Sequence, residues 1–185
     1  MRSCCGCCTR LGCLPTPTNI GLVSSFDFST SGTATVPTAD EMRAFGAHLG
    51  ATLRPGDLVI LDGPLGAGKT TLTQGIGEGM QVRGRVTSPT FTIAREHRPA
   101  VTGGCPLVHM DCYRLLDTGG DVLGALDAID VDTDLTDCAV VAEWGEGLVE
   151  QLTDAYLLVQ ISRGSDDEVR TVSWRRVQGD AGMGH

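Results

Sequence analysis

The stretch of the sequence with the clearest chemistry is Gly63–Thr70, which reads Gly-Pro-Leu-Gly-Ala-Gly-Lys-Thr. It fits the P-loop (Walker A) pattern G-x-x-x-x-G-K-[ST], in which backbone N–H groups surround a phosphate. Glycines permit positive φ angles and leave no Cβ in the path of the ligand. Lys69 supplies a cation for the β- and γ-phosphates, and the Thr70 hydroxyl is placed to bind Mg²⁺. The stretch therefore predicts a nucleoside triphosphate site.

The segments on either side of the loop have the pattern that this motif needs. Residues 58–61 form a short apolar, partly β-branched run, which is typical of a buried strand. Residues 70–80 place apolar side chains at helical spacing, so a helix is predicted to begin within the motif. The residues expected to contact the nucleotide here are Gly63, Leu65, Gly66, Ala67, Gly68, Lys69, Thr70 and Thr71.

Two later apolar strands each end in an acidic residue. Leu107–Met110 leads to Asp111, and Ala139–Ala142 leads to Glu143. Ligands of open α/β sheets bind beyond the carboxyl ends of the strands, and phosphoryl transfer needs groups that hold Mg²⁺ or orient the attacking water. Either acid could do so, or could only cap the turn that follows its strand. We expect Lys69, Asp111 and Glu143 to form the catalytic set.

The remaining pattern predicts an α/β fold. Thr38 and Glu41 fit a capping box, so a helix is expected to begin there, although Thr38 could also lie near the nucleotide base. Strands are predicted at 92–97 and 106–111, and the gap between them is too short for a crossover helix, so they should pair as an antiparallel hairpin.

A second hairpin is predicted for 156–161 and 168–174, and one helix at about 121–129 within an acidic stretch. The expected architecture is a P-loop NTPase-like three-layer sandwich with a mixed, mainly parallel sheet and antiparallel hairpins.

Composition limits the classes of protein to consider. The 185 residues are 41% hydrophobic and 20% charged, which suits one globular domain, expected at 36–178, with a flexible tail at 179–185. The formal net charge of −9 argues against broad contact with a nucleic-acid backbone. No apolar run reaches the roughly 18 residues that a membrane span needs, so no membrane association is expected.

Five of the eight cysteines lie within the first 13 residues, in a spacing that matches no usual zinc site. We therefore expect residues 1–35 to be a disordered extension rather than a structural metal site. The other three, Cys105, Cys112 and Cys138, are predicted to be small buried hydrophobic residues, as in proteins of a reducing cytoplasm.

Four motifs in this order and spacing resemble the TsaE family, the small P-loop ATPase of bacterial tRNA threonylcarbamoyladenosine (t6A) biosynthesis. They are Gly-Ala-Gly-Lys-Thr-Thr at 66–71, Ser-Pro-Thr-Phe at 88–91, Asp-Cys-Tyr-Arg-Leu at 111–115 and Glu-Trp at 143–144. The P-loop occurs in very many proteins, and the three motifs after it are far more specific. The resemblance covers about residues 38–177.

The resemblance implies a cytoplasmic ATPase that uses ATP and Mg²⁺ and is weak on its own. Its partner would be the TsaB–TsaD pair, whose turnover ATP hydrolysis would support, and tRNA would be reached only indirectly through that complex. By motif, Thr70 and Glu143 would hold Mg²⁺, and Asp111 would be the second acid near the γ-phosphate. The loop at 88–91, which contains Thr90, would sense the nucleotide.

The resemblance leaves the roles of three further side chains open. Trp144 would contact the nucleotide or a partner, or belong to the core. Tyr113 and Arg114 would serve the partner interface or the site, or Arg114 would be a structural pair for the acidic segment. The chain departs from the family pattern at Pro64, where members usually have aspartate, in the Gly- and Asp-rich segment after Leu115, and in its Cys-rich start. Because Pro64 occupies a variable position of the P-loop, phosphate binding should survive.

Two other functions are compatible with a P-loop. A small kinase for a nucleoside or metabolite would normally carry an arginine-rich lid, whereas the only close basic pair in the last third is Arg175-Arg176. A nucleotide-sensing adaptor would bind ATP without catalytic cycling. Release of phosphate to water, repeated over many turnovers, separates the predicted ATPase from both.

Overall fold

The computed structural model describes residues 26–88, 94–113, 135–145, 149, 153, 155–164 and 169–178. They form a seven-stranded sheet with the strand order β1-β7-β6-β2-β5-β4-β3. The strands are β1 (Gly32–Val36), β2 (Leu58–Asp62), β3 (Ala94–His97), β4 (Leu107–Asp111), β5 (Ala139–Glu143), β6 (Ala155–Arg163) and β7 (Arg170–Gln178). The helical segments are α1 (Ala39–Gly50), α2 (Lys69–Gly79) and the short 3₁₀ turn η1 (Leu135–Asp137).

The centre of the sheet is parallel and its edges are antiparallel. The neighbours β6, β2, β5 and β4 run in one direction, and both predicted hairpins, β3–β4 and β6–β7, are confirmed. These pairings confirm the predicted mixed α/β sheet. Among the described strands, however, β1 and β7 are also antiparallel. Parallel and antiparallel strand pairs are therefore equal in number, and the sheet is not mainly parallel. Short connections force the antiparallel pairing of β3 with β4 and of β6 with β7, because a parallel pair needs a long crossover.

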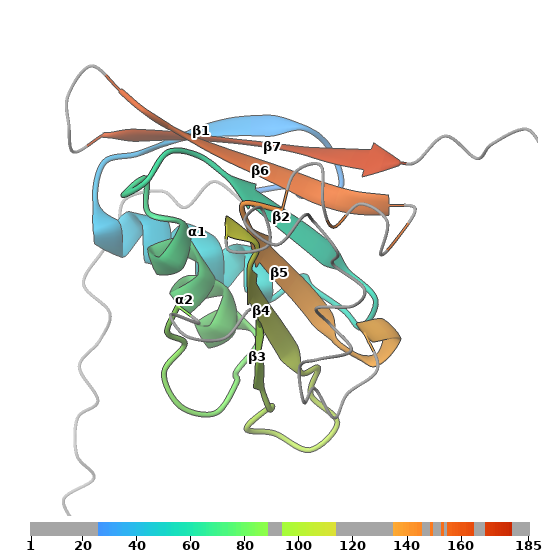
Figure 1. Ribbon diagram of the computed structural model, residues 1–185. Helices are drawn as coiled ribbons and strands as arrows, with labels where there is room; N and C mark the ends of the chain where they lie inside the picture. The colour runs from blue at the N-terminus through green and yellow to red at the C-terminus, as the bar shows by residue number, and fades with distance from the viewer. Residues whose placement is uncertain are drawn as a thin grey trace, which may run out of the picture.

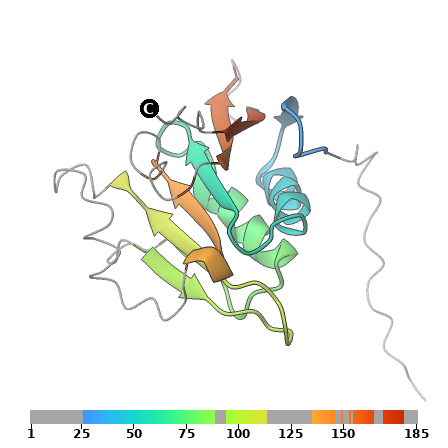
Figure 2. The ribbon, with the colours of Figure 1, turned by 90° about the vertical axis from the view of Figure 1, so that its right-hand side faces the viewer.

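Helices α1 and α2 lie side by side on one face of the sheet (Figures 1 and 2). A Cβ at Gly75 would lie 2.1 Å from the carbonyl oxygen of Arg43, so the glycine lets the two helix backbones touch. Within the described part of the chain the helices cover this face only, and the helix predicted at 121–129 lies outside it. Neither described helix is long and apolar enough to cross a membrane.

The local predictions for α1 and the core are confirmed. The Thr38 side chain accepts a hydrogen bond from the Glu41 N–H and the Glu41 carboxylate accepts one from the Thr38 N–H, which is a complete capping box. The apolar stripes of α1 and α2 pack on the sheet, with Phe45, Leu49, Leu72 and Ile76 at most 2% exposed. Cys112 and Cys138 are buried, as predicted, whereas Cys105 is partly exposed.

The expectation that residues 1–35 lack structure is wrong for the part from residue 26 onward. Strand β1 pairs with β7 at one edge of the sheet, and Phe28 is only 4% exposed. The rings of Phe28, Phe45 and Trp174 pack together, with centroids 5.4–5.5 Å apart. These contacts join segments far apart in sequence, so the short Thr-Ala-Thr-Val alternation alone gave too weak a signal. Residues 1–25 lie outside the described residues.

Candidate functional site

The P-loop connects the carboxyl end of β2 to the start of α2, as predicted. Gly63 has φ 146°, and a Cβ there would lie 2.5 Å from the carbonyl oxygen of Ile161 on β6. Only glycine fits this first position of the loop. Helix α2 begins at Lys69, directly after the last glycine of the motif. The loop therefore presents its N–H groups at the positive end of a helix, where phosphate binds.

Lys69 is buried in the loop with its ammonium between carbonyl oxygens and an aromatic ring. Its Nζ donates to the carbonyl oxygens of Gly63, at 2.6 Å, and Pro64, at 3.1 Å, and lies 3.7 Å from the centroid of the Trp144 ring. Burial lowers the pKa of Lys69, while the negative charges of Glu143, Asp62 and Asp111 act in the opposite direction. The ammonium thus lies within the loop and uses two of its three donors on loop carbonyl oxygens.

Thr70 and Glu143 meet across the end of the sheet. Glu143 is the last residue of β5, and β2 is its parallel neighbour, with Leu61 opposite Glu143. The Thr70 hydroxyl donates to Glu143 Oε1 at 3.2 Å and lies 3.5 Å from Oε2. The side chain of Glu143 is only 6% exposed. The structure thus brings Lys69, Thr70 and Glu143 to one place, as the sequence predicted.

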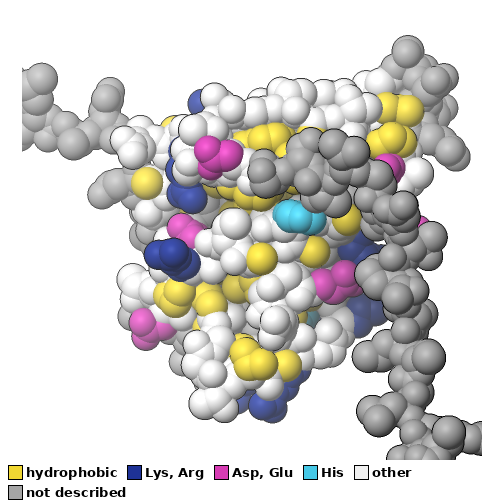
Figure 3. Space-filling model, turned by 180° about the vertical axis from the view of Figure 1, so that it is seen from behind, with side chains coloured by type: hydrophobic (Ala, Val, Ile, Leu, Met, Phe, Trp, Pro, Cys, Tyr) yellow, Lys and Arg dark blue, Asp and Glu magenta, His cyan; other side chains and the backbone are white. Residues whose placement is uncertain are grey.

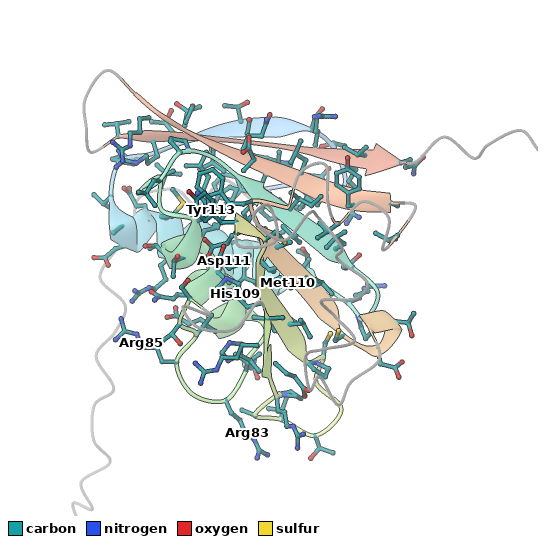
Figure 4. All side chains as sticks on the ribbon, in the orientation of Figure 1. Arg83, Arg85, His109, Met110, Asp111 and Tyr113 are labelled. Carbon is teal, nitrogen blue, oxygen red and sulfur yellow. The ribbon has the colours of Figure 1, made fainter. Side chains whose placement is uncertain are left out.

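Asp111 lies beside this group on the next strand. It is opposite Glu143 in the β4–β5 register and is partly exposed. Its Oδ1 accepts a hydrogen bond from the Tyr113 N–H at 3.2 Å, which caps the turn after β4. Figure 4 shows Asp111 and His109 together beside α2. Asp111 therefore combines the two roles that were predicted as alternatives, capping the turn and lying at the site.

One buried contact at the site was not predicted. His109, two residues before Asp111, is fully buried, and its Nε2 lies 2.9 Å from Glu143 Oε1. Alternation along a strand puts residues i and i+2 on the same face, so the spacing of His109 and Asp111 was the available signal. A single histidine inside an apolar strand does not by itself predict a contact with Glu143.

An aromatic pair lies over Lys69. Trp144 has a left-handed backbone, with φ 61°, and donates its N–H to the carbonyl oxygen of Leu61. Tyr113, 58% exposed, packs against Trp144 with ring centroids 5.7 Å apart. Of the two roles considered for Trp144, the structure favours a place at the site over the core. Thr90 and Arg114 lie outside the described residues.

A cavity of about 170 Å³ adjoins the loop on the side away from the acids. Its lining is mixed, with small, apolar and basic residues, namely Thr38, Ala39, Met42, Gly66, Ala67, Gly68, Thr71 and Arg170. Nearby, Arg163 Nη2 donates to the carbonyl oxygen of Leu65 at 2.7 Å. Neither arginine was predicted as a site residue, because both reach the loop only through the pairing of β6 with β2 and β7.

The donor set at Thr70 and Glu143 suits Mg²⁺. Among the described residues, no three His, Cys, Asp or Glu side chains form a cluster that could hold a metal by themselves. Mg²⁺ does not need such a cage, because it is commonly held by one or two carboxylates together with substrate phosphates and waters. One hydroxyl and one buried carboxylate, 3.2 Å apart at the phosphate-binding loop, match that pattern.

Known proteins with the same sequence pattern and fold carry a consistent name. A family model described as "Threonylcarbamoyl adenosine biosynthesis protein TsaE" matches residues 36–172. A Mycobacterium tuberculosis protein named tRNA threonylcarbamoyladenosine biosynthesis protein TsaE is 50% identical over 144 residues, covering 77% of this chain and 86% of that protein. A Streptomyces coelicolor protein of the same name is 54% identical over 135 residues, covering 71% and 88%.

A solved structure is also similar. The crystal structure of Bacillus subtilis YdiB aligns with a TM-score of 0.59 at 30% sequence identity, covering 81% of this chain and 87% of that one. The similarity extends over most of both chains, so it supports the α/β P-loop-like architecture for the domain as a whole.

Proposed function

The chain belongs to the TsaE family of threonylcarbamoyl adenosine biosynthesis proteins, and we propose that it is the ATP-binding and ATP-hydrolysing component of tRNA t6A formation. The observation that carries this proposal is the convergence of Lys69, Thr70 and Glu143 at the P-loop. A loop lysine, a hydroxyl and a strand-end carboxylate in one place are the groups with which P-loop proteins hold a Mg²⁺-bound triphosphate.

The loop and the cavity beside it would bind different parts of the nucleotide. The backbone N–H groups at the start of α2 and the ammonium of Lys69 would hold the phosphates. The cavity beside Thr71 and Arg170 would accept the nucleoside, with the guanidinium of Arg170 as a planar cation for the base or the α-phosphate. Backbone and lysine thus fix the phosphates, and Arg170 adds affinity.

Thr70 and Glu143 would hold Mg²⁺, directly or through water. Bound there, the ion would neutralise negative charge on the β- and γ-phosphate oxygens. Asp111, directly across from Glu143 in the sheet, has one carboxylate oxygen engaged in capping and would use the other to orient the attacking water. Together the side chains position the reacting groups, which is the main requirement of phosphoryl transfer.

Activity would depend on protein partners, for which the TsaB–TsaD pair is our candidate. Two exposed apolar side chains lie at the site, Leu65 in the loop at 84% exposure and Tyr113 at 58%. Exposed apolar groups next to a nucleotide site suit a contact that a partner completes. ATP hydrolysis would then support turnover of the assembled complex.

Contact with tRNA would be indirect, through that complex and in the cytoplasm. The chain carries a net charge of −9. On the face shown in Figure 3, basic and acidic side chains are interspersed and do not form a patch of one sign. Direct phosphate-backbone binding depends on clustered Lys and Arg, so this surface does not favour it.

The test begins with nucleotide binding. Titration of the purified chain with ATP, followed by calorimetry, should show binding that Lys69→Ala removes. Phosphate release should be slow for the chain alone and faster when the TsaB–TsaD pair is added, and t6A formation by the mixture should require both ATP and Glu143. A chain that binds no ATP with or without partners would contradict the proposal.

The products separate the two alternatives. A kinase would pass the phosphoryl group to a nucleoside or metabolite, which labelled ATP would reveal. A nucleotide-sensing adaptor would release at most one phosphate per binding event even with its partners present. Repeated release of phosphate to water in the assembled complex would exclude both.

A further inference from the structure

The buried imidazole of His109 lies directly beneath the carboxylate of Glu143. Their side chains are 0% and 6% exposed, and His109 Nε2 is 2.9 Å from Glu143 Oε1. In the β4–β5 register Asp111 is opposite Glu143. His109 lies on the same strand as Asp111, two residues further from the end of the sheet. The contact is therefore sheltered from water, where a hydrogen bond orients its partner most strongly.

The chemistry of the pair assigns the proton. An ionised carboxylate only accepts hydrogen bonds, so the Nε2–H of His109 is the donor to Glu143, and the other ring nitrogen is Nδ1. That Nδ1 is buried and has no hydrogen-bond partner among the described residues. Leaving a buried polar atom unpaired costs stability. As a core residue His109 is unfavourable, and its contact with Glu143 is the feature that distinguishes it.

The two hydrogen bonds on Glu143 are unequal in their effect on its two oxygens. Oε1 accepts from His109 at 2.9 Å and from the Thr70 hydroxyl at 3.2 Å, whereas Oε2 has only the 3.5 Å contact to Thr70. Two donors on one oxygen fix the plane of the carboxylate. The second oxygen is then left for another ligand beside the P-loop.

We propose that His109 is a positioning residue, which holds the Glu143 carboxylate in the orientation that binds the metal of the metal–nucleotide complex. The inference rests on the proposed function, since it assigns a role within the same site. Hydrogen-bond partners of metal-binding carboxylates fix their orientation, and removing such a partner commonly lowers metal affinity about 10–100-fold. His109 touches neither nucleotide nor metal in this role, so its effect passes through Glu143.

The test measures metal binding separately from activity. Mn²⁺ replaces Mg²⁺, and its dissociation constant in the presence of ADP is measured by electron paramagnetic resonance. His109→Leu removes the donor and should raise that constant about 10–100-fold, while ADP affinity in the presence of a chelator changes less than about twofold. His109→Gln carries an N–H donor of similar reach and should retain most of the metal affinity.

A second buried histidine supplies the matched control. His97, on β3, is 7% exposed and faces the same side of the sheet, but no hydrogen bond joins it to Glu143 within the described structure. His97→Leu should leave the Mn²⁺ constant unchanged. An equal loss in His97→Leu and His109→Leu would show a general packing effect and overturn the inference.

A shorter amide keeps the test decisive if His109→Leu does not fold. His109→Asn is polar but too short to reach Glu143, so it should lose metal affinity that His109→Gln keeps. Equal metal affinity in the wild-type, Gln and Asn proteins would overturn the role of His109 while leaving the metal site intact. Absence of Mn²⁺–ADP binding in the wild-type protein would instead refute the proposed function itself.

Discussion

The two sides of the P-loop differ in how far their side chains are buried and how they are held in place. The inner side, which faces β4 and β5, consists of the buried or half-buried side chains Lys69, Thr70, His109 and Glu143. Thr70 and His109 contact the Glu143 carboxylate, and Lys69 donates to carbonyl oxygens of the loop. The outer side faces the β6–β7 hairpin and the start of α1. It consists of Leu65, Arg163, Arg170 and Thr38, which are partly or fully exposed around an open cavity.

The difference suggests that the inner side serves hydrolysis and the outer side serves recognition of the nucleotide. Thr70, His109 and Glu143 already hold one another in place, so under the proposed function these groups would need little reorganisation to receive phosphates and metal. Groups on the outer side are anchored mainly by backbone, as in the bond from Arg163 to the Leu65 carbonyl oxygen. Substitutions on the inner side should therefore abolish nucleotide binding or hydrolysis, and substitutions on the outer side should lower ATP affinity only moderately.

The largest expected effect follows from Lys69→Ala on the inner side. Loss of a buried cation that binds phosphate should weaken ATP affinity at least about 100-fold, since charge-assisted hydrogen bonds contribute about 1.5–3 kcal/mol each. Calorimetric titration measures the change, and circular dichroism checks that the variant is folded. Unchanged affinity would place the phosphates elsewhere and remove the distinction between the two sides.

Glu143→Ala should separate binding from hydrolysis. We expect the rate of phosphate release in the assembled complex to fall about 100–1,000-fold, the range seen when one group that stabilises a transition state is lost. Metal-free nucleotide affinity should change less than about threefold, because the loop amides and Lys69 remain. Asp111→Ala, on the neighbouring strand, is compared with it, because the proposed function assigns Asp111 to the attacking water and Glu143 to the metal. Full activity in Glu143→Ala with a loss in Asp111→Ala would move the principal metal ligand to Asp111.

The inner side, except for His109, could be predicted from sequence because its residues come from local patterns joined by one general rule. The P-loop motif specifies Lys69 and Thr70, and the rule that ligands bind at the carboxyl ends of parallel strands brings in Asp111 and Glu143. The observed register, with Leu61 opposite Glu143 and Glu143 opposite Asp111, supplies the positions that the rule leaves open.

The outer side could not be predicted in the same way. Arg163 and Arg170 face each other across the β6–β7 hairpin, and only the pairing of β6 with β2 brings them to the loop. Strand β1 has a similar dependence, since β7 and the aromatic cluster around Phe28 stabilise it. Non-local pairing has no signature within one short segment, which is why the expectation of a disordered extension fails for residues 26–35.

Arg170→Ala tests whether the cavity on the outer side receives the nucleoside. We expect the ATP dissociation constant to rise about 5–10-fold with kcat within about twofold, because the interaction is the same in ground and transition states. Arg175→Ala is the matched control, since Arg175 is an exposed arginine on the same strand outside this cavity. Equal effects of the two variants would indicate a general charge effect and leave the cavity without a role.

The pH dependence of ADP binding, measured with a chelator present, tests the burial of Lys69. Because burial lowers the pKa of Lys69 in the free protein, part of the lysine becomes neutral as pH rises towards that lowered value. Neutral lysine binds phosphate less well, so affinity should fall as pH rises through the alkaline range, beginning below the ordinary lysine pKa of about 10.4. In Lys69→Arg the guanidinium stays charged, so its affinity should be flat over this range. A fall of the same size in both proteins would assign the pH dependence to another group.

The smallest expected effect belongs to Arg163→Ala. The Arg163 side chain is exposed, and its 2.7 Å bond to the Leu65 carbonyl oxygen supports the shape of the loop without placing a charge among the phosphates. A hydrogen bond of this kind contributes about 0.5–1.5 kcal/mol, so ATP affinity should fall only about two- to threefold. Arg163→Lys should behave like Ala if the geometry of the guanidinium is what matters, and like wild type if charge alone matters. A loss as large as that of Lys69→Ala would mean that Arg163 reaches the phosphates, and the outer side would then belong to the chemistry.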